Sequence, residues 1–128
     1  MTETTKKITG VLVNPAANTA EEITIDHSLE GFYKALDCSC IDIVARKIAG
    51  KRFDIICDDE ALLNGDPIPA ASDTAGRVML FNRLFVVRYD GAESVRSLDQ
   101  HEAAHVLRCT RSIRWFDRTI KILYPVEY

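Results

Sequence analysis

The strongest constraint on the fold is a pair of strand-like segments in the middle of the chain. Residues 41–48 (IDIVARKI) and 52–57 (RFDIIC) are rich in β-branched residues and alternate polar with apolar positions. That period places one set of side chains on a core. Because Gly50 and Lys51 lie between the two segments as a turn, we expect them to be consecutive strands of a sheet.

The same pattern occurs nearer the start of the chain. Residues 8–14 (ITGVLVN) form a β-rich segment that ends at Pro15, and residues 22–26 (EITID) alternate in polarity. Proline favours a turn, so the two segments predict an antiparallel pair. A short helix should follow, because Ser28 can cap it and apolar residues recur at helical spacing through residues 29–36. Gly31 opposes this helix by about 1 kcal/mol relative to alanine.

The second half of the chain begins with a long turn-rich stretch, residues 58–76, which we expect to be a loop that carries function. Residues 78–89 predict an apolar strand with a bulge at Asn82-Arg83. The sequence from Ser97 to Gln100 fits a capping box and predicts the start of a helix. Neither Gly nor Pro follows until Pro125, so the helix is expected to continue that far, with a break near Thr110 or Ser112.

Together these elements predict one α+β domain with a mostly antiparallel sheet of about five strands, one short helix and a C-terminal helical segment. The 128 residues are enough for a single core. We divide the chain into a flexible N-terminus (1–7), an α+β domain (8–107) and a basic amphipathic C-terminal extension (108–128) packed on or beside it. No apolar run approaches the roughly 20 residues needed to cross a membrane, and no signal peptide is evident. We therefore expect a cytoplasmic protein with reduced cysteines.

A possible metal site lies in the second predicted helix. His101, Glu102 and His105 have the H-E-x-x-H spacing of zinc peptidases, in which two imidazoles bind zinc and the glutamate is the base. Arg108 and Arg111 stand where one zinc-peptidase class has its glycine and third histidine. We therefore expect no metal or other cofactor, and interpret this motif as the solvated polar flank of a helix; a small zinc hydrolase is the alternative.

Charge is unevenly distributed along the chain. The formal net charge is −3, yet residues 108–128 hold 5 basic and 2 acidic side chains. On a helical projection Arg111, Arg114, Arg118 and Lys121 share one side, which predicts a basic amphipathic helix. Its arginines, with Trp115 among them, either face water or contact phosphates or an acidic partner.

Acidic residues gather around the long loop, namely Asp54, Asp58, Asp59, Glu60 and Asp66. They form a solvated turn, bind a hard cation or mimic a phosphate surface. The candidate binding residues from both charged regions are Asp59, Glu60, Asn64, Arg111, Arg114, Trp115 and Arg118.

Two stretches, IICDDEALLNGDPIP and LFNRLFVVRYDGAESVRSLDQHE, together with ITGVLVNPA and ITIDHSLEGFYKAL, resemble the family called domain of unknown function 3846 over about residues 8–107. In that family an Asn-Glu pair corresponds to Asp59-Glu60, and a glycine stands at Asn82. The resemblance implies an accessory protein of phages, plasmids or conjugative elements, with no catalytic residues to transfer.

From these observations we expect a non-enzymatic protein that binds a host or element-encoded protein partner through the long loop and the C-terminal segment. Inhibition of host defence is one form such binding could take. The alternatives are a nucleic-acid-binding protein that uses the C-terminal arginines and the zinc hydrolase. A homodimer is expected if one chain does not cover the apolar side of the C-terminal segment.

Overall fold

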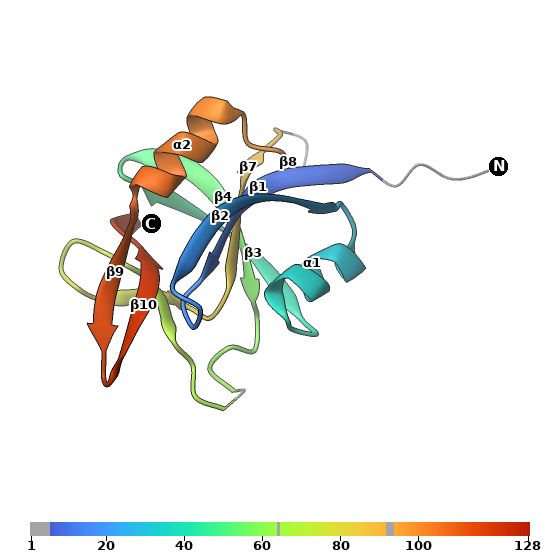
Figure 1. Ribbon diagram of the computed structural model, residues 1–128. Helices are drawn as coiled ribbons and strands as arrows, with labels where there is room; N and C mark the ends of the chain where they lie inside the picture. Colours follow the sequence, from blue (N-terminus) through green and yellow to red (C-terminus); the bar gives the residue numbers. More distant parts are fainter. Residues whose placement is uncertain (1–5, 64, 92–93) are drawn as a thin grey trace.

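The computed structural model describes residues 6–63, 65–91 and 94–128. Two helices and eleven strands lie in this part of the chain (Figure 1). Their order and bounds are β1 (Lys7–Asn14), β2 (Thr19–Asp26), α1 (Leu29–Leu36), β3 (Ile41–Ile48), β4 (Lys51–Asp58), β5 (Pro69–Ser72), β6 (Val78–Phe81), β7 (Leu84–Tyr89), β8 (Val95–Arg96), α2 (Gln100–Arg108), β9 (Thr110–Trp115), β10 (Arg118–Leu123) and β11 (Val126–Glu127).

The strands form two sheets. The main sheet has seven strands in the order β11-β3-β4-β7-β1-β2, with β8 paired to β7, and its pairings are antiparallel. The second sheet has four strands in the order β6-β5-β10-β9, of which β5 and β10 are parallel. The prediction of an α+β fold with a mostly antiparallel sheet is confirmed, but the main sheet alone exceeds the five strands expected.

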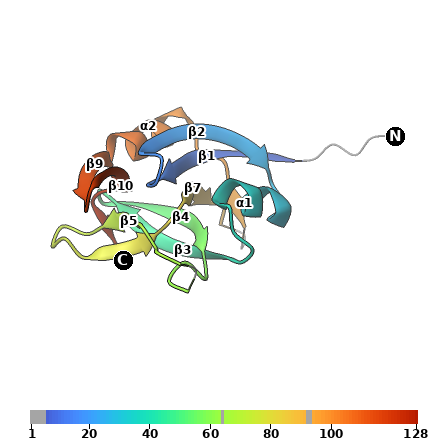
Figure 2. The same ribbon diagram turned by 60° about the horizontal axis from the view of Figure 1, so that its bottom comes forward.

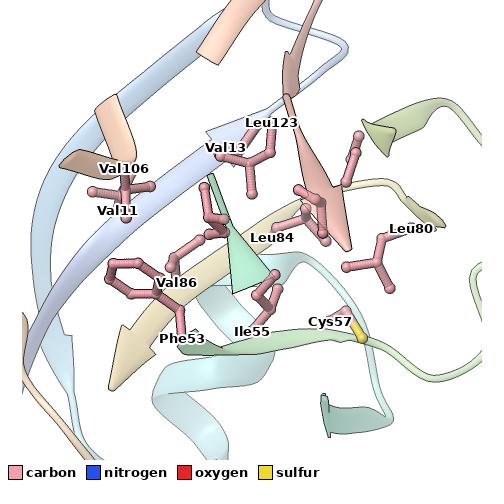
Figure 3. Close-up of a cluster of buried hydrophobic side chains, with 14 of the residues drawn as sticks. Val11, Val13, Phe53, Ile55, Cys57, Leu80, Leu84, Val86, Val106 and Leu123 are labelled. Atoms are coloured by element: carbon pink, nitrogen blue, oxygen red, sulfur yellow. The ribbon is translucent and has the colours of Figure 1, made fainter. Parts of the chain in front are cut away.

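The central strands β4 and β7 are buried on both faces of the main sheet. In β7, Leu84 and Val86 point into one apolar cluster, and Phe85 and Val87 point into another. Burial on both faces explains why apolar residues follow one another without interruption in β7. The first cluster lies between the main sheet, α2 and the second sheet (Figure 3). The second cluster lies under α1, on the other face of the main sheet.

The first half of the chain follows the sequence-based prediction closely. Strands β1, β3 and β4 match the predicted segments within one residue at each end, and β2 begins three residues earlier than expected. The Ser28 side chain caps α1 by accepting a hydrogen bond of 3.1 Å from the Gly31 backbone N–H. Alternation and turn residues therefore defined this region well.

The break predicted at Asn82 is larger than a bulge. Asn82 has a φ of 65° and separates β6 from β7, which belong to different sheets. Its side-chain oxygen accepts a 3.0 Å hydrogen bond from the Ile68 N–H, and its own N–H donates to the Ile68 carbonyl at 2.7 Å. Asparagine adopts this left-handed conformation more readily than most residues, so it can replace the glycine that the resemblance implies here.

The predicted C-terminal helix is wrong. After α2 ends at Arg108, the chain forms an antiparallel hairpin of β9 and β10, followed by β11, which pairs with β3. The sequences TRSIRW and RTIKIL contain several β-branched residues, which favour strands over a helix, and exposure alternates over residues 113–115 and 120–122. The absence of Gly and Pro was misleading, because Phe116 itself adopts the turn conformation, with a φ of 55°.

The second helix begins two residues later than predicted. Its N-cap is Asp99, whose carboxylate accepts from the Glu102 N–H at 2.8 Å, while Glu102 accepts from the Asp99 N–H at 2.9 Å. This is a capping box with the same spacing as the one expected from Ser97 and Gln100. Ser97 instead accepts a 2.9 Å hydrogen bond from the backbone of Thr9.

In the described part of the chain neither helix is long and apolar enough to cross a membrane. All four cysteines are free thiols.

Gly31 is required by packing, although it weakens the helix locally. A Cβ atom at this position would lie 2.1 Å from the backbone carbonyl oxygen of Asp26. No atom can approach that closely, and the obstacle is backbone that cannot rotate away.

We therefore predict that Gly31→Ala destabilises the protein by about 2 kcal/mol, although helix propensity alone would favour alanine. Urea unfolding followed by circular dichroism would measure the change. Lys34→Ala, at an exposed position of the same helix, is the control and should change stability by less than about 0.5 kcal/mol. A stabilised Gly31→Ala variant would contradict this packing.

Candidate binding surface

The H-E-x-x-H motif lies in α2, but its three side chains face different surroundings. His101 is exposed, as predicted. His105 is partly buried, since its ring stacks on Phe53 with centroids 5.6 Å apart and its Nε2 lies 2.7 Å from the Ile48 carbonyl oxygen. A carbonyl oxygen can only accept, so Nε2 of His105 carries the proton and donates. The prediction of a solvated flank is therefore wrong for His105.

Glu102 is buried, with 4% of its surface exposed. Its two carboxylate oxygens each accept a 3.1 Å hydrogen bond from Arg96, and Arg88 lies 3.2 Å from Oε2. Burial opposes its ionisation, but the hydrogen bonds from Arg96 and Asp99 and the nearby positive charge of Arg88 outweigh it, and the pKa of Glu102 is lowered.

The motif therefore has a structural use in this fold. Glu102 is held by two guanidinium groups and by the helix cap, and one nitrogen of His105 is engaged by a backbone carbonyl. Among the described residues, no group of three His, Cys, Asp or Glu side chains is arranged to hold a metal ion. A general base would need a carboxylate that is not already neutralised by paired guanidinium groups.

Glu102→Gln is predicted to reduce the free energy of unfolding by about 2 kcal/mol, less than for a fully buried pair because both arginines are partly exposed. The measurement is urea unfolding at neutral pH. His101→Ala is the matched control within the motif and should leave stability within about 0.5 kcal/mol of the wild type.

The difference between wild type and Glu102→Gln should also depend on pH. The folded-state pKa of Glu102 lies below its unfolded value of about 4.3, so its contribution is complete above that pH and is lost as the pH falls through the folded pKa. The two unfolding curves should therefore converge in acid. A constant difference down to about pH 2 would contradict the role assigned to the carboxylate.

The turn after β4, which carries Asp59 and Glu60, lies beside β6, the edge strand of the second sheet. Asp59 is exposed and Glu60 partly buried in the turn after β4, and the backbone N–H of Glu60 donates to the Asp58 carboxylate at 2.9 Å. Leu62 and Leu63, beside them, are 67% and 78% exposed.

Two of the residues predicted for this region cannot be placed in it. Asn64, a predicted binding residue, lies outside the described residues. Asp54 does not belong to the loop region; it is buried in β4, its nearest cation is Arg52 at 3.8 Å, and burial raises its pKa.

The predicted basic residues lie in the hairpin at the opposite end of the same sheet, so Asp59 and Glu60 do not line the surface that Arg111 and Trp115 line. Within β9, Arg111 and Trp115 share one face with Ile113, whereas Arg114 faces the other way. Arg118 donates a 2.9 Å hydrogen bond to the Ala16 carbonyl in the β1–β2 turn. The single basic stripe expected from a helix is therefore absent from the described hairpin.

A groove of about 310 Å³ runs over the outer face of the second sheet. Its floor and walls come from all four strands of that sheet and from the residues that join or follow them, including Pro69, Val78, Ile113, Trp115, Ile122 and Tyr124. Leu123, the neighbour of Ile122, points to the opposite face and into the core. The Arg111 guanidinium lies over the Tyr124 ring, 3.9 Å from its centroid, which fixes a positive charge on the rim of the groove.

A second hollow, of about 440 Å³, lies between the β1–β2 turn, the end of α1 and the Asn82 break. Two of the three charged groups that line it are already used within the chain: the Asp58 carboxylate accepts from Glu60, and the Arg83 guanidinium donates to the Ala35 carbonyl at 3.3 Å. The apolar groove is the stronger candidate, because burying its aliphatic and aromatic walls removes apolar area from water.

Sequence reasoning found Arg111 and Trp115 but missed the rest of the groove. Tyr124 is far in the sequence from Pro69 and Val78, and the parallel pairing of β5 with β10 brings it beside them. The antiparallel pairing of β5 with β6 places Val78 beside β5. The available signal was the period of two in Arg111, Ile113 and Trp115, which a helical projection conceals.

The structure is that of a small α+β protein with an apolar groove on its second sheet. The chain belongs to the family described as domain of unknown function (DUF3846), whose profile matches residues 8–110. This confirms the resemblance found from the sequence. No curated protein and no solved structure matches the chain significantly.

Proposed function

We propose that this chain is a non-enzymatic binding protein that holds a protein partner against the groove of its second sheet. The observation that carries the proposal is the chemistry of the groove: apolar and aromatic walls with one fixed guanidinium on the rim. Trp, Tyr and Arg are the residues that dominate the energy of protein interfaces.

The groove lining favours binding over catalysis. No carboxylate, imidazole or thiol is found among the described residues that line it, so no general acid or base stands ready. The hydroxyl of Ser72 donates to the backbone carbonyl of Asp73 at 3.1 Å and has no adjacent base in this lining.

A partner would also cover aromatic surface at the hairpin tip. Phe116 is 83% exposed and packs edge-on against Trp115, with centroids 4.8 Å apart. Exposed aromatic side chains beside an apolar groove are typical of an interaction site. The hairpin is held at both ends, so little conformational entropy is lost on binding.

A protein partner is favoured over nucleic acid. Phosphate backbones attract a continuous row of cations, but Arg111 and Arg114 lie on opposite faces of β9, and Arg118 is engaged by Ala16. The net charge of −3 also opposes general binding to nucleic acid. The partner in this proposal is a host or element-encoded protein, and inhibition of host defence is one outcome that its binding would serve.

Site-specific photocrosslinking in the native host cell tests this function. A benzoylphenylalanine that replaces Trp115 should crosslink to a discrete protein, whereas the same group at Leu29, an exposed position on α1, should not. Arg111→Glu should lower the crosslink yield about tenfold. Lys51→Glu makes the same charge change at the exposed first residue of β4, in the main sheet, and should have no effect.

Two results would contradict the proposal. One is equal crosslinking at Trp115 and Leu29, since binding would then not be localised to the groove. The other is a crosslinked product whose added mass is removed by nuclease, which would support the nucleic-acid alternative.

A further inference from the structure

Strand β9 is the last strand of the second sheet, and Figures 1 and 2 both show it at the margin of the molecule beside β10. Its pairing with β10 runs without a shift in register from Trp115–Arg118 to Thr110–Leu123. The Tyr124 N–H donates to the Cys109 carbonyl at 2.7 Å, so Cys109 is a hydrogen-bonded position of the ladder.

Such positions alternate along an antiparallel pair. Arg111, Ile113 and Trp115 therefore direct their backbone groups toward β10, and Ser112 and Arg114 direct theirs outward. No hydrogen bond of these outward backbone groups is found within the described chain. The outer edge of β9 is thus a row of donors and acceptors available to another strand.

The charge of β9 selects what can pair with it. The strand contains two arginines and no carboxylate. Neither Arg111 nor Arg114 forms an ion pair with any of the described residues. Pairing of two β9 strands from two copies would gather guanidinium groups in one ladder, and like charges across a ladder are destabilising. An acidic strand would instead place carboxylates beside both arginines.

The groove adds a preference for alternating side chains. A strand next to β9 turns every second side chain toward the face that carries Arg111, Ile113 and Trp115. Apolar side chains beside Ile113 and Trp115 would extend the groove, and an acidic one would lie beside Arg111. Main-chain pairing with pockets for alternate side chains is a general mode of peptide recognition.

We propose that β9 binds an extended segment of the partner, with acidic and aliphatic side chains, as an added strand of the second sheet. This inference rests on the proposed function, because the same surface holds the partner. It specifies that the outward backbone groups of Ser112 and Arg114 pair with that segment.

The first test uses the full chain and fluorescein-labelled peptides of Val and Ile that carry Glu or Asp at two positions three residues apart, as Arg111 and Arg114 are, so that one carboxylate lies on each face of the strand. Binding is followed by fluorescence anisotropy. We expect saturable binding that Arg111→Glu and Arg114→Glu each weaken about tenfold. Lys51→Glu should leave it unchanged. A peptide with Lys in place of the acidic residues should not bind the wild type but should bind the double variant Arg111→Glu/Arg114→Glu.

The second test isolates the backbone contribution. In the best-binding peptide, methylation of alternate backbone nitrogens removes the donors on one edge only. One set of methyl groups should weaken binding at least tenfold and the complementary set by less than about twofold, because only one edge of a strand can face β9. In hydrogen exchange, the Ser112 and Arg114 amides should become protected when the peptide binds.

The outcomes separate this inference from the proposed function. Binding that both methylated sets retain, without protection of Ser112 or Arg114, would overturn strand addition while leaving the groove as the binding surface. Failure of every acidic peptide to bind, or tighter binding of an oligothymidylate, would also overturn it. If benzoylphenylalanine at position 115 crosslinks to no discrete protein, the proposed function itself is contradicted.

Discussion

The buried carboxylate of Glu102 ties three elements of the fold together. It accepts hydrogen bonds from Arg96 in β8, lies beside Arg88 in β7 and closes the cap of α2 through Asp99. A buried carboxylate is tolerated only when its charge is matched and its oxygens have donors, and here both conditions are met. This contact fixes where α2 begins and which face it buries, so that Ala103 and Val106 enter the core.

The position of α2 in turn determines where the second sheet forms. The helix ends at Arg108, and the carbonyl of the next residue, Cys109, accepts from the Tyr124 N–H, which closes the base of the β9–β10 hairpin. Leu123 of β10 pairs with Ala71 of β5, and Val126 of β11 pairs with Ile48 of β3. The hairpin is therefore anchored to both sheets, which gives the groove rigid walls before any partner arrives.

Local sequence patterns were sufficient for much of the fold and insufficient for the site. Strands β3 and β4 and the cap of α1 follow from alternation, a turn and Ser28, which act over a few residues. The β9–β10 hairpin was not predicted, because its turn at Phe116 has no glycine and its residues also fit the pattern of an amphipathic helix. Glu102 and His105 were misassigned because their partners, Arg88 and Ile48, are remote in the sequence.

The family match ends at the start of the β9–β10 hairpin, and this boundary indicates which part of the chain would give the proposed complex its specificity. The match covers residues 8–110, which include β5 and β6 on one wall of the groove, whereas nearly all of the β9–β10 hairpin lies beyond it. The hairpin supplies both unpaired arginines and Trp115, the groups that would distinguish one acidic segment from another. A main-chain edge pairs with any extended segment, so discrimination must come from side chains and from repulsion of wrong partners. The proposed complex therefore takes its scaffold from the part of the chain that matches the family and its selectivity from the hairpin that follows.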